Sequence, residues 1–189
     1  MTARISDEAQ AQLLAFAALV EGWADRLDLV STLDLERFHE RHVLDSLRAL
    51  PLVDSLPPGP GVDVGSGAGL PGVPLAICRP ERTWRLLEPR RRRAAFLEEV
   101  VRALDLSCEV VTLTAEQAAT EPGLAASHVI GLARAVAPPP TALAMVRPLV
   151  RPDGVAGVFV APAQPIPPEA TVWRGALAIV RADGSLPPP

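Results

Sequence analysis

The sequence predicts a doubly wound α/β fold with a mostly parallel sheet, preceded by a helical extension at the N-terminus. Short segments with strand character alternate with helical segments over the last two thirds of the chain, which is the pattern of a parallel sheet covered by helices on both faces. A glycine-rich loop, Gly65-Ser66-Gly67-Ala68-Gly69, follows the first of these strand segments and leads into a helical one. Ligands of such folds bind outside the carboxyl ends of the strands, so this loop marks the expected binding edge.

The composition indicates one globular folding unit. The chain has 189 residues, of which 49% are hydrophobic and 21% charged, and these values argue against disorder. No apolar run reaches the roughly 18 residues of a membrane-spanning helix, and the start of the chain lacks the apolar core of a signal peptide. Cys78 and Cys108 lie in apolar segments, so we expect reduced core thiols in a cytoplasmic protein. We further expect a monomer without a membrane partner.

The positive charge of the chain is unusual in kind and in distribution. The sequence contains no lysine, so all 18 basic residues are arginines, and the net charge is −4. Between Arg79 and Arg102, however, eight arginines stand against four glutamates. Arg90, Arg91, Arg92 and Arg93 fall at the expected start of a helix, where the helix dipole does not favour cations. A solvated helix start is the plain interpretation, and an anionic partner is the one that we favour.

The N-terminal helical extension is expected to cover residues 1–56. Ser6 can cap a first helix, whose apolar residues recur at helical spacing through Leu27. Asp34 can cap a second helix, which we expect to end at Pro51 because proline disrupts a helix interior. The second region is expected to cover residues 57–189, and it begins with the proline- and glycine-rich residues 57–61.

The second region contains the expected sheet. The segment 161–170 carries four prolines and should not be helical. Helices are expected at residues 75–77, 94–104 and 141–150. Strands are expected at residues 62–64, 83–87, 109–113, 128–132, 155–160 and 172–180.

The glycine loop and two carboxylates form the candidate ligand site. Asp63 ends the first strand and can orient a ligand through the loop amides or through water, while Glu88 ends the next strand and can accept both hydroxyls of a ribose. The pattern Asp-x-Gly-x-Gly-x-Gly favours the methyl donor S-adenosylmethionine. The rival interpretation is dinucleotide binding, because Gly67 to Gly72 match G-x-G-x-x-G. That match begins three residues past the strand, and Leu70-Pro71 would crowd a pyrophosphate. A purely structural turn is the third alternative.

The run from Asp63 to Ile77, with Leu70-Pro71-Gly72 directly after the glycines, resembles the signature of the glucose-inhibited division protein B family, also called RsmG. Further matching segments lie in the same order along the chain, at residues 41–47, 86–89, 92–93, 96–97, 115–116 and 133–135. Members of that family methylate N7 of one guanine in small-subunit (16S) ribosomal RNA. The resemblance therefore implies a class I methyltransferase fold, S-adenosylmethionine as donor, and the small-subunit RNA or the subunit as partner.

The resemblance also implies roles for individual residues. Gly65 and Leu70 should contact the methionine end of the donor, within the cradle that Gly67 and Gly69 complete. Arg134 should lie beside the donor as the catalytic residue. The remaining roles are adenine binding by Ala115 and Glu116, and RNA binding by Arg41, His42, Arg92 and Arg93.

The chain departs from the family pattern at several points. Asp28 stands where the family usually has asparagine, and Ala161-Pro162 stands where it usually has Lys-Gly. The prolines of residues 161–170 replace a helix of the family. A methyltransferase with another small acceptor, or a paralogue that binds the donor without turnover, therefore remain alternatives.

The residue inventory fits N7 methylation and argues against a metal. Guanine N7 carries no proton, so its methylation needs placement and a suitable field rather than a general base. His39, His42 and Asp45 fall three apart on one helix face, but a closed zinc site needs four ligands, and we expect no metal. Cys78 and Cys108 are expected in a helix and at a strand, which argues against a nucleophilic cysteine.

Overall fold

The protein is built around one seven-stranded sheet with the strand order β3-β2-β1-β4-β5-β7-β6. The structure, a computed structural model, describes residues 5–24, 26–27, 29, 35, 37–161 and 164–181. Neighbouring strands from β3 to β5 run parallel, and β7 is antiparallel to both of its neighbours. The strands are β1 (Gly61–Val64), β2 (Trp84–Leu87), β3 (Cys108–Val111), β4 (His128–Ala133), β5 (Val150–Phe159), β6 (Thr171–Trp173) and β7 (Leu177–Arg181).

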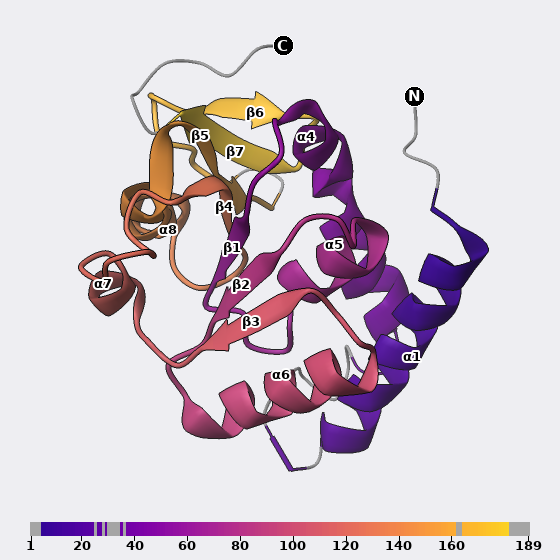
Figure 1. Ribbon diagram of the computed structural model, residues 1–189. Coiled ribbons are helices and arrows are strands. Elements are labelled where there is room, and N and C mark those ends of the chain that lie inside the picture. The colour runs from indigo at the N-terminus through magenta and orange to yellow at the C-terminus, as the bar shows by residue number, and fades with distance from the viewer. Residues whose placement is uncertain are drawn as a thin grey trace.

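Helices cover both faces of this sheet, as the alternating pattern predicted. One face packs against α1 (Asp7–Ala24), α5 (Gly72–Cys78) and α6 (Arg91–Ala103), and the other against α7 (Ala115–Ala118) and α8 (Pro139–Val146). In Figure 1, α7 and α8 stand on the left of the sheet, and α1 and α5 stand on the right. No helix in the described part of the chain is both long and apolar enough to cross a membrane.

Two boundaries predicted in the C-terminal part are wrong. Residues 172–180 are not one strand, because Arg174 and Gly175 adopt positive φ angles of 46° and 64° and turn the chain between β6 and β7. The helix expected to reach residue 150 ends at Val146, and a 3₁₀ turn (Arg147–Leu149) leads into a long β5. Residues 164–170 contain no helix, as expected.

The helix predicted to end at Pro51 instead continues past it in a changed form. The chain winds through a π turn (His39–Val43), the short α3 (Leu44–Ser46) and a 3₁₀ turn (Leu47–Ala49) into α4 (Leu50–Ser55). Pro51 occupies the first turn of α4, where its missing N–H has no intrahelical partner to lose. The proline therefore starts a helix, and the expectation that it ends one is wrong. The predicted cap Asp34 lies outside the described residues.

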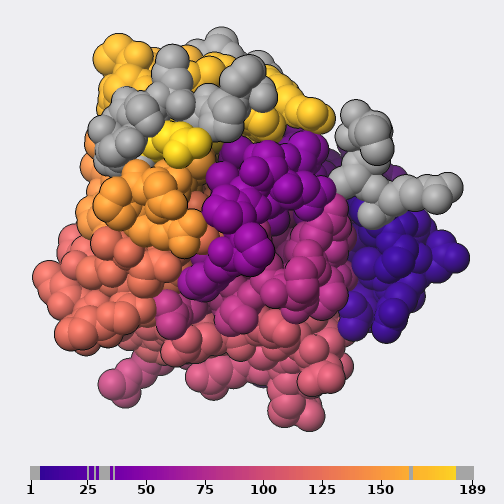
Figure 2. Space-filling model, turned by 45° about the horizontal axis from the view of Figure 1, so that its top comes forward, coloured from indigo at the N-terminus to yellow at the C-terminus, as the bar shows by residue number. Residues whose placement is uncertain are grey.

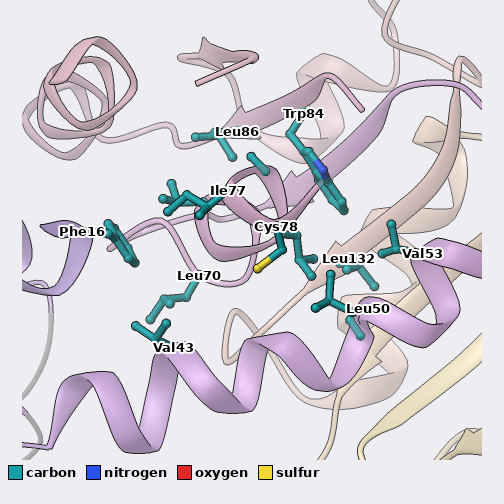
Figure 3. Packing of buried hydrophobic residues seen from close by; sticks show 14 of the residues in the cluster. Phe16, Val43, Leu50, Val53, Leu70, Ile77, Cys78, Trp84, Leu86 and Leu132 are labelled. Atoms are coloured by element: carbon teal, nitrogen blue, oxygen red, sulfur yellow. The ribbon is translucent and has the colours of Figure 1, made fainter. Parts of the chain in front are cut away.

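The N-terminal helices share one hydrophobic core with the sheet. Phe16 of α1 and Leu50 of α4 belong to the same buried cluster as Leu70, Ile77 and the strand residues beneath them. Figure 3 shows these side chains converging between the helical segment and the sheet. The helical extension thus buries its apolar face against α5 and α6 instead of forming a core of its own.

Arg82 joins the helical extension to the sheet layer. This side chain is only 8% exposed, although it is charged. Its guanidinium donates to the carbonyl oxygens of Gly59 and Pro57 in the linker, and Nη2 lies 3.4 Å from the carbonyl of Val53 in α4. One cation thus serves several carbonyls where the linker meets α4, and its contact with Val53 is buried.

We expect Arg82→Met to lower the free energy of unfolding by about 2 kcal/mol, because the partly buried carbonyls of the linker lose a charged donor while the apolar stem is kept. Urea unfolding followed by circular dichroism measures this loss. The matched control is Arg102→Met, since Arg102 forms an exposed pair with Glu99 on α6 and should change stability little. Equal losses in the two variants would contradict the role assigned to Arg82.

Candidate functional site

The glycine loop forms an open cradle at the carboxyl end of β1. Gly65, Gly67 and Gly69 have φ angles of 71°, 55° and 94°, which favour glycine. A Cβ at Gly65 or Gly69 would meet a valine methyl at 2.8 Å, whereas a Cβ at Gly67 would meet nothing closer than 3.8 Å. Packing therefore explains two of the glycines, and Gly67 is the one that leaves open space.

Asp63 in β1 contacts the start of the helix that follows the glycine loop. Its side chain has no exposed surface, and Oδ2 accepts the backbone N–H of Gly72, the first residue of α5, at 3.0 Å. Oδ1 is buried and has no hydrogen-bond partner among the described residues. Burial raises the pKa of Asp63 to about 7, although the hydrogen bond from Gly72 opposes that rise. This contact joins β1 to the start of α5, and the orientation of a ligand by Asp63, through the loop amides or through water, stays a prediction.

Glu88 holds the loop from the side of β2. Its two carboxylate oxygens accept the backbone N–H groups of Gly67 at 3.0 Å and of Arg90 at 2.9 Å. Glu88 is 4% exposed and follows β2 directly. A carboxylate oxygen can accept more than one hydrogen bond, so these contacts preorganise Glu88 and leave it capacity for hydroxyl groups.

Arg134 lies at the end of β4, beside the glycine loop. Val64 and Ala133 are paired residues at the ends of β1 and β4, so Gly65 and Arg134 follow neighbouring positions. The guanidinium turns toward the helical extension, where Nη1 donates to the carbonyl of His42 at 2.9 Å. Burial lowers the pKa of Arg134, and the charges of nearby carboxylates, including Asp63, oppose that effect. The resemblance alone did not indicate this direction of the side chain.

The predicted adenine-binding residues begin a helix that the sequence analysis missed. Ala115 and Glu116 open α7, and Thr114 and Gln117 form a capping box before it. Ala115 is buried, and Glu116 is exposed. The spacing of Thr114 and Gln117 is a helix-start signature that was present in the sequence. The N–H of Glu88 donates to the carbonyl of Val111, so the end of β3 lies beside the end of β2. The chain passes from this end of β3 into α7.

Leu70 is placed differently from the other predicted donor contacts. Its side chain is 7% exposed and belongs to the buried cluster shared with α1. In Figure 3, Leu70 lies between Phe16 and Val43. The structure therefore shows a packing contact for this residue, and its contact with the methionine end of a donor stays a prediction.

The predicted RNA-binding residues fall into two groups. Arg92 and Arg93 line a surface hollow together with Arg26, Leu27, Arg90 and Arg91. Arg92 Nη2 also donates to the carbonyl of Arg26 at 3.0 Å. Arg93 Nη1 lies 3.9 Å from the position of a Cβ on Gly67, so this hollow borders the cradle. No feature of the local sequence indicated that Arg26 belongs to this group.

The second group lies on the π turn of the helical extension. Arg41 is exposed and His42 is partly exposed. The turn continues into helical residues that lie beside the C-terminal strands, where Arg48 Nη2 donates to the carbonyl of Gly175 at 3.1 Å. Figure 2 shows this purple helical segment directly beside the yellow C-terminal strands.

The remaining candidates have structural surroundings. Among the described residues, no three His, Cys, Asp or Glu side chains gather as a metal site would require. Cys78 ends α5 and Cys108 begins β3, as expected for core thiols, although Cys108 is only partly buried. Burial raises the pKa of Cys78 to about 11 and that of Cys108 to about 12. Both thiols are therefore poor nucleophiles near neutral pH.

Solved structures of low sequence identity share this fold. A structural-genomics protein from Corynebacterium glutamicum superimposes with a TM-score of 0.61 at 13% identity, over 89% of this chain and 89% of its own. A putative methyltransferase from Escherichia coli superimposes with a TM-score of 0.55 at 14% identity, over 74% of this chain and 86% of its own. With the strand order above, these likenesses show the predicted class I methyltransferase fold.

Curated relatives are similar over most of the chain, and three are named ribosomal RNA small subunit methyltransferase G. The relative from Acidiphilium cryptum is 44% identical over 76% of this chain and 64% of its own length. Those from Granulibacter bethesdensis and Roseiflexus castenholzii are 39% and 37% identical, over 80% and 93% of this chain and 68% and 73% of their own. The chain thus spans about two thirds of the length of these relatives. The family model described as rRNA small subunit methyltransferase G, GidB, matches residues 9–161. The chain therefore belongs to the GidB family, the family that its glycine-loop sequence resembles.

Proposed function

We propose that the protein transfers the methyl group of S-adenosylmethionine to N7 of a guanine in small-subunit ribosomal RNA. The observation that carries this proposal is the open cradle at Gly67, whose N–H is held by the carboxylate of Glu88 and which follows the strand of the buried Asp63. Family membership gives the acceptor class, and the arginine-lined hollow beside the cradle supplies a surface for phosphates.

The residues of the cradle fit this donor. The open position at Gly67 accommodates a ligand against the backbone, and buried Asp63 supports the same strand end through its contact with Gly72. Glu88, held by two N–H groups, would hold the ribose hydroxyls. Ala115 and Glu116, at the end of the next strand, would hold the adenine. We place the methionine end along Gly65, Gly69 and Leu70.

The donor supplies an activated methyl group on a sulfonium. Guanine N7 presents a lone pair without a proton, so no residue of this chain has to act as a general base. The protein contributes placement and a preorganised field. Glu88 and the loop amides orient the donor, Arg134 fixes the helical turn at His42 beside it, and the arginines of the hollow bind RNA phosphates.

The deciding experiment is mass mapping of modified guanines in small-subunit RNA after incubation with protein and donor. We expect one new N7-methylguanine in unmodified small subunits. Donor binding without transfer to subunits, free RNA or extract would instead support a non-catalytic paralogue. Transfer to a small molecule in the extract would support a different acceptor.

We expect S-adenosylmethionine to raise the melting temperature of the protein, because it binds only the folded state. Gly67→Val should abolish this rise, since the side chain fills the cradle. Gly175→Val is the matched control, because Gly175 also has a positive φ and open surroundings but lies in the β6–β7 turn. It should lose comparable stability and keep the donor-induced rise. A rise with a nicotinamide dinucleotide and none with the methyl donor would contradict the proposal.

We expect Arg92→Gln to weaken RNA binding at all sequences and to lower the slope of log affinity against log salt by roughly one unit. Filter binding at several salt concentrations measures both effects. Donor affinity should stay unchanged in this variant, whereas Arg93→Gln should reduce it as well, because Arg93 borders Gly67. Arg102→Gln, near the far end of α6, is the control that should change neither. An unchanged salt slope in Arg92→Gln would exclude the hollow as the phosphate site.

A further inference from the structure

The helical turn that carries His42 is wound more loosely than an α-helix. In the π turn His39–Val43, the N–H of Leu44 donates to the carbonyl of His39, five residues earlier. Such single π turns are rare and recur at functional sites. The carbonyl of His42 accepts from the hydroxyl of Ser46 at 2.7 Å and from Arg134 Nη1 at 2.9 Å. A residue 92 positions away in the sequence therefore fixes this turn to the edge of the sheet.

The same guanidinium determines where the ring of His42 carries its proton. Arg134 Nη2 lies 2.8 Å from His42 Nδ1. A guanidinium has donors and no acceptor, so Nδ1 must accept this hydrogen bond. The neutral ring of His42 therefore carries its proton on Nε2 and can donate from there.

His128 shows the opposite arrangement in the same molecule. Its Nδ1 lies 2.7 Å from the carbonyl oxygen of Leu149, which can only accept, and its Nε2 lies 3.2 Å from Arg85 Nη1, which can only donate. His128 therefore carries its proton on Nδ1. The two histidines are thus expected in different tautomers because different partners face their Nδ1 atoms.

His42 lies close to the edge where the donor is expected. Arg134 directly follows β4, whose last residue pairs with the residue before Gly65. Arg134 thus links the His42 ring to the carboxyl end of β4. The ring is partly exposed, and it also packs against Phe38, with 5.7 Å between the ring centroids.

We propose that Arg134 is a positioning residue that fixes His42 in the Nε2–H tautomer, and that this N–H recognises O6 of the acceptor guanine. The inference rests on the proposed function and deepens it. The major-groove edge of guanine offers two acceptors, N7 and O6, whereas adenine offers the N7 acceptor and an N6 amino donor. A donor on His42 pairs with O6 and leaves the lone pair of N7 for the methyl group. The amino group of adenine would set a donor against a donor.

Nitrogen-15 NMR of the histidine rings tests the tautomer without any activity measurement. In the wild-type protein at neutral pH, we expect the proton of His42 on Nε2 and that of His128 on Nδ1. Arg134→Met should change the His42 signal toward a mixture of tautomers and leave His128 unchanged. Arg85→Met is the matched control and should affect only His128. A proton on Nδ1 of His42 in the wild-type protein would overturn the proposal.

Two isosteric variants test the role of the N–H in base recognition. Glutamine can place an amide nitrogen near Nε2 and keep the donor, whereas asparagine can place an amide oxygen near Nδ1 and keep only the contact with Arg134. We expect His42→Gln to retain guanine methylation and His42→Asn to lose about 10- to 100-fold in kcat/KM, the range of one base-specific hydrogen-bonded contact. Both variants should keep the affinity for S-adenosylmethionine, measured by calorimetry.

The outcomes separate this inference from the proposed function. If the wild-type protein methylates no RNA, the proposed function fails, and the NMR result still decides the state of His42. If the wild-type protein methylates guanine and His42→Asn is as active as wild type, the inference alone is overturned. A rescue by His42→Gln, with the tautomer change in Arg134→Met, supports both parts of the inference.

Discussion

A buried carboxylate at the end of β1 is the constraint on which the binding edge depends. Asp63 has no exposed surface. Its hydrogen bond from the N–H of Gly72 connects the end of β1 to the first turn of α5. A buried charge is costly unless it is hydrogen-bonded, so β1 and α5 must lie close enough for this hydrogen bond to form. The intervening chain is short, and it turns at Gly65, Gly67 and Gly69, which have positive φ angles. The open cradle at Gly67 follows from that closure, which Glu88 completes from β2.

Arginines connect parts of the chain that lie far apart in the sequence. Arg82 binds carbonyls of the linker, Arg92 binds the carbonyl of Arg26, and Arg134 binds the π turn at His42. A guanidinium offers five donors in a fixed plane and can serve several carbonyls at once, which an ammonium group does less well. In this chain without lysine, some arginines hold distant segments together, some line the hollow beside the cradle, and Arg92 does both. A count of basic residues cannot separate these roles.

The part of the sheet that forms the cradle and the C-terminal part are built differently. The cradle is formed by the ends of β1, β2 and β4, which are central in the sheet and covered on both faces. After β5, the described residues 164–170 form no helix, and a short hairpin completes the sheet edge. Ala161 is exposed, whereas its neighbour Pro162 and the departure Asp28 lie outside the described residues.

The sequence by itself determined the parallel part of the sheet, the glycine loop and the edge at which a ligand is expected. Periodicity, glycine placement and strand–helix alternation are local, so residues such as Asp63 and Glu88 could be assigned to strand ends directly. Only the tertiary structure decided that Pro51 starts a helix, that Arg26 joins the arginine hollow and that Arg134 faces His42. These outcomes depend on contacts between residues up to 92 positions apart. The direction of a side chain depends on the partners that packing brings near it. Those partners lie far away in the sequence, so the neighbouring residues do not predict them.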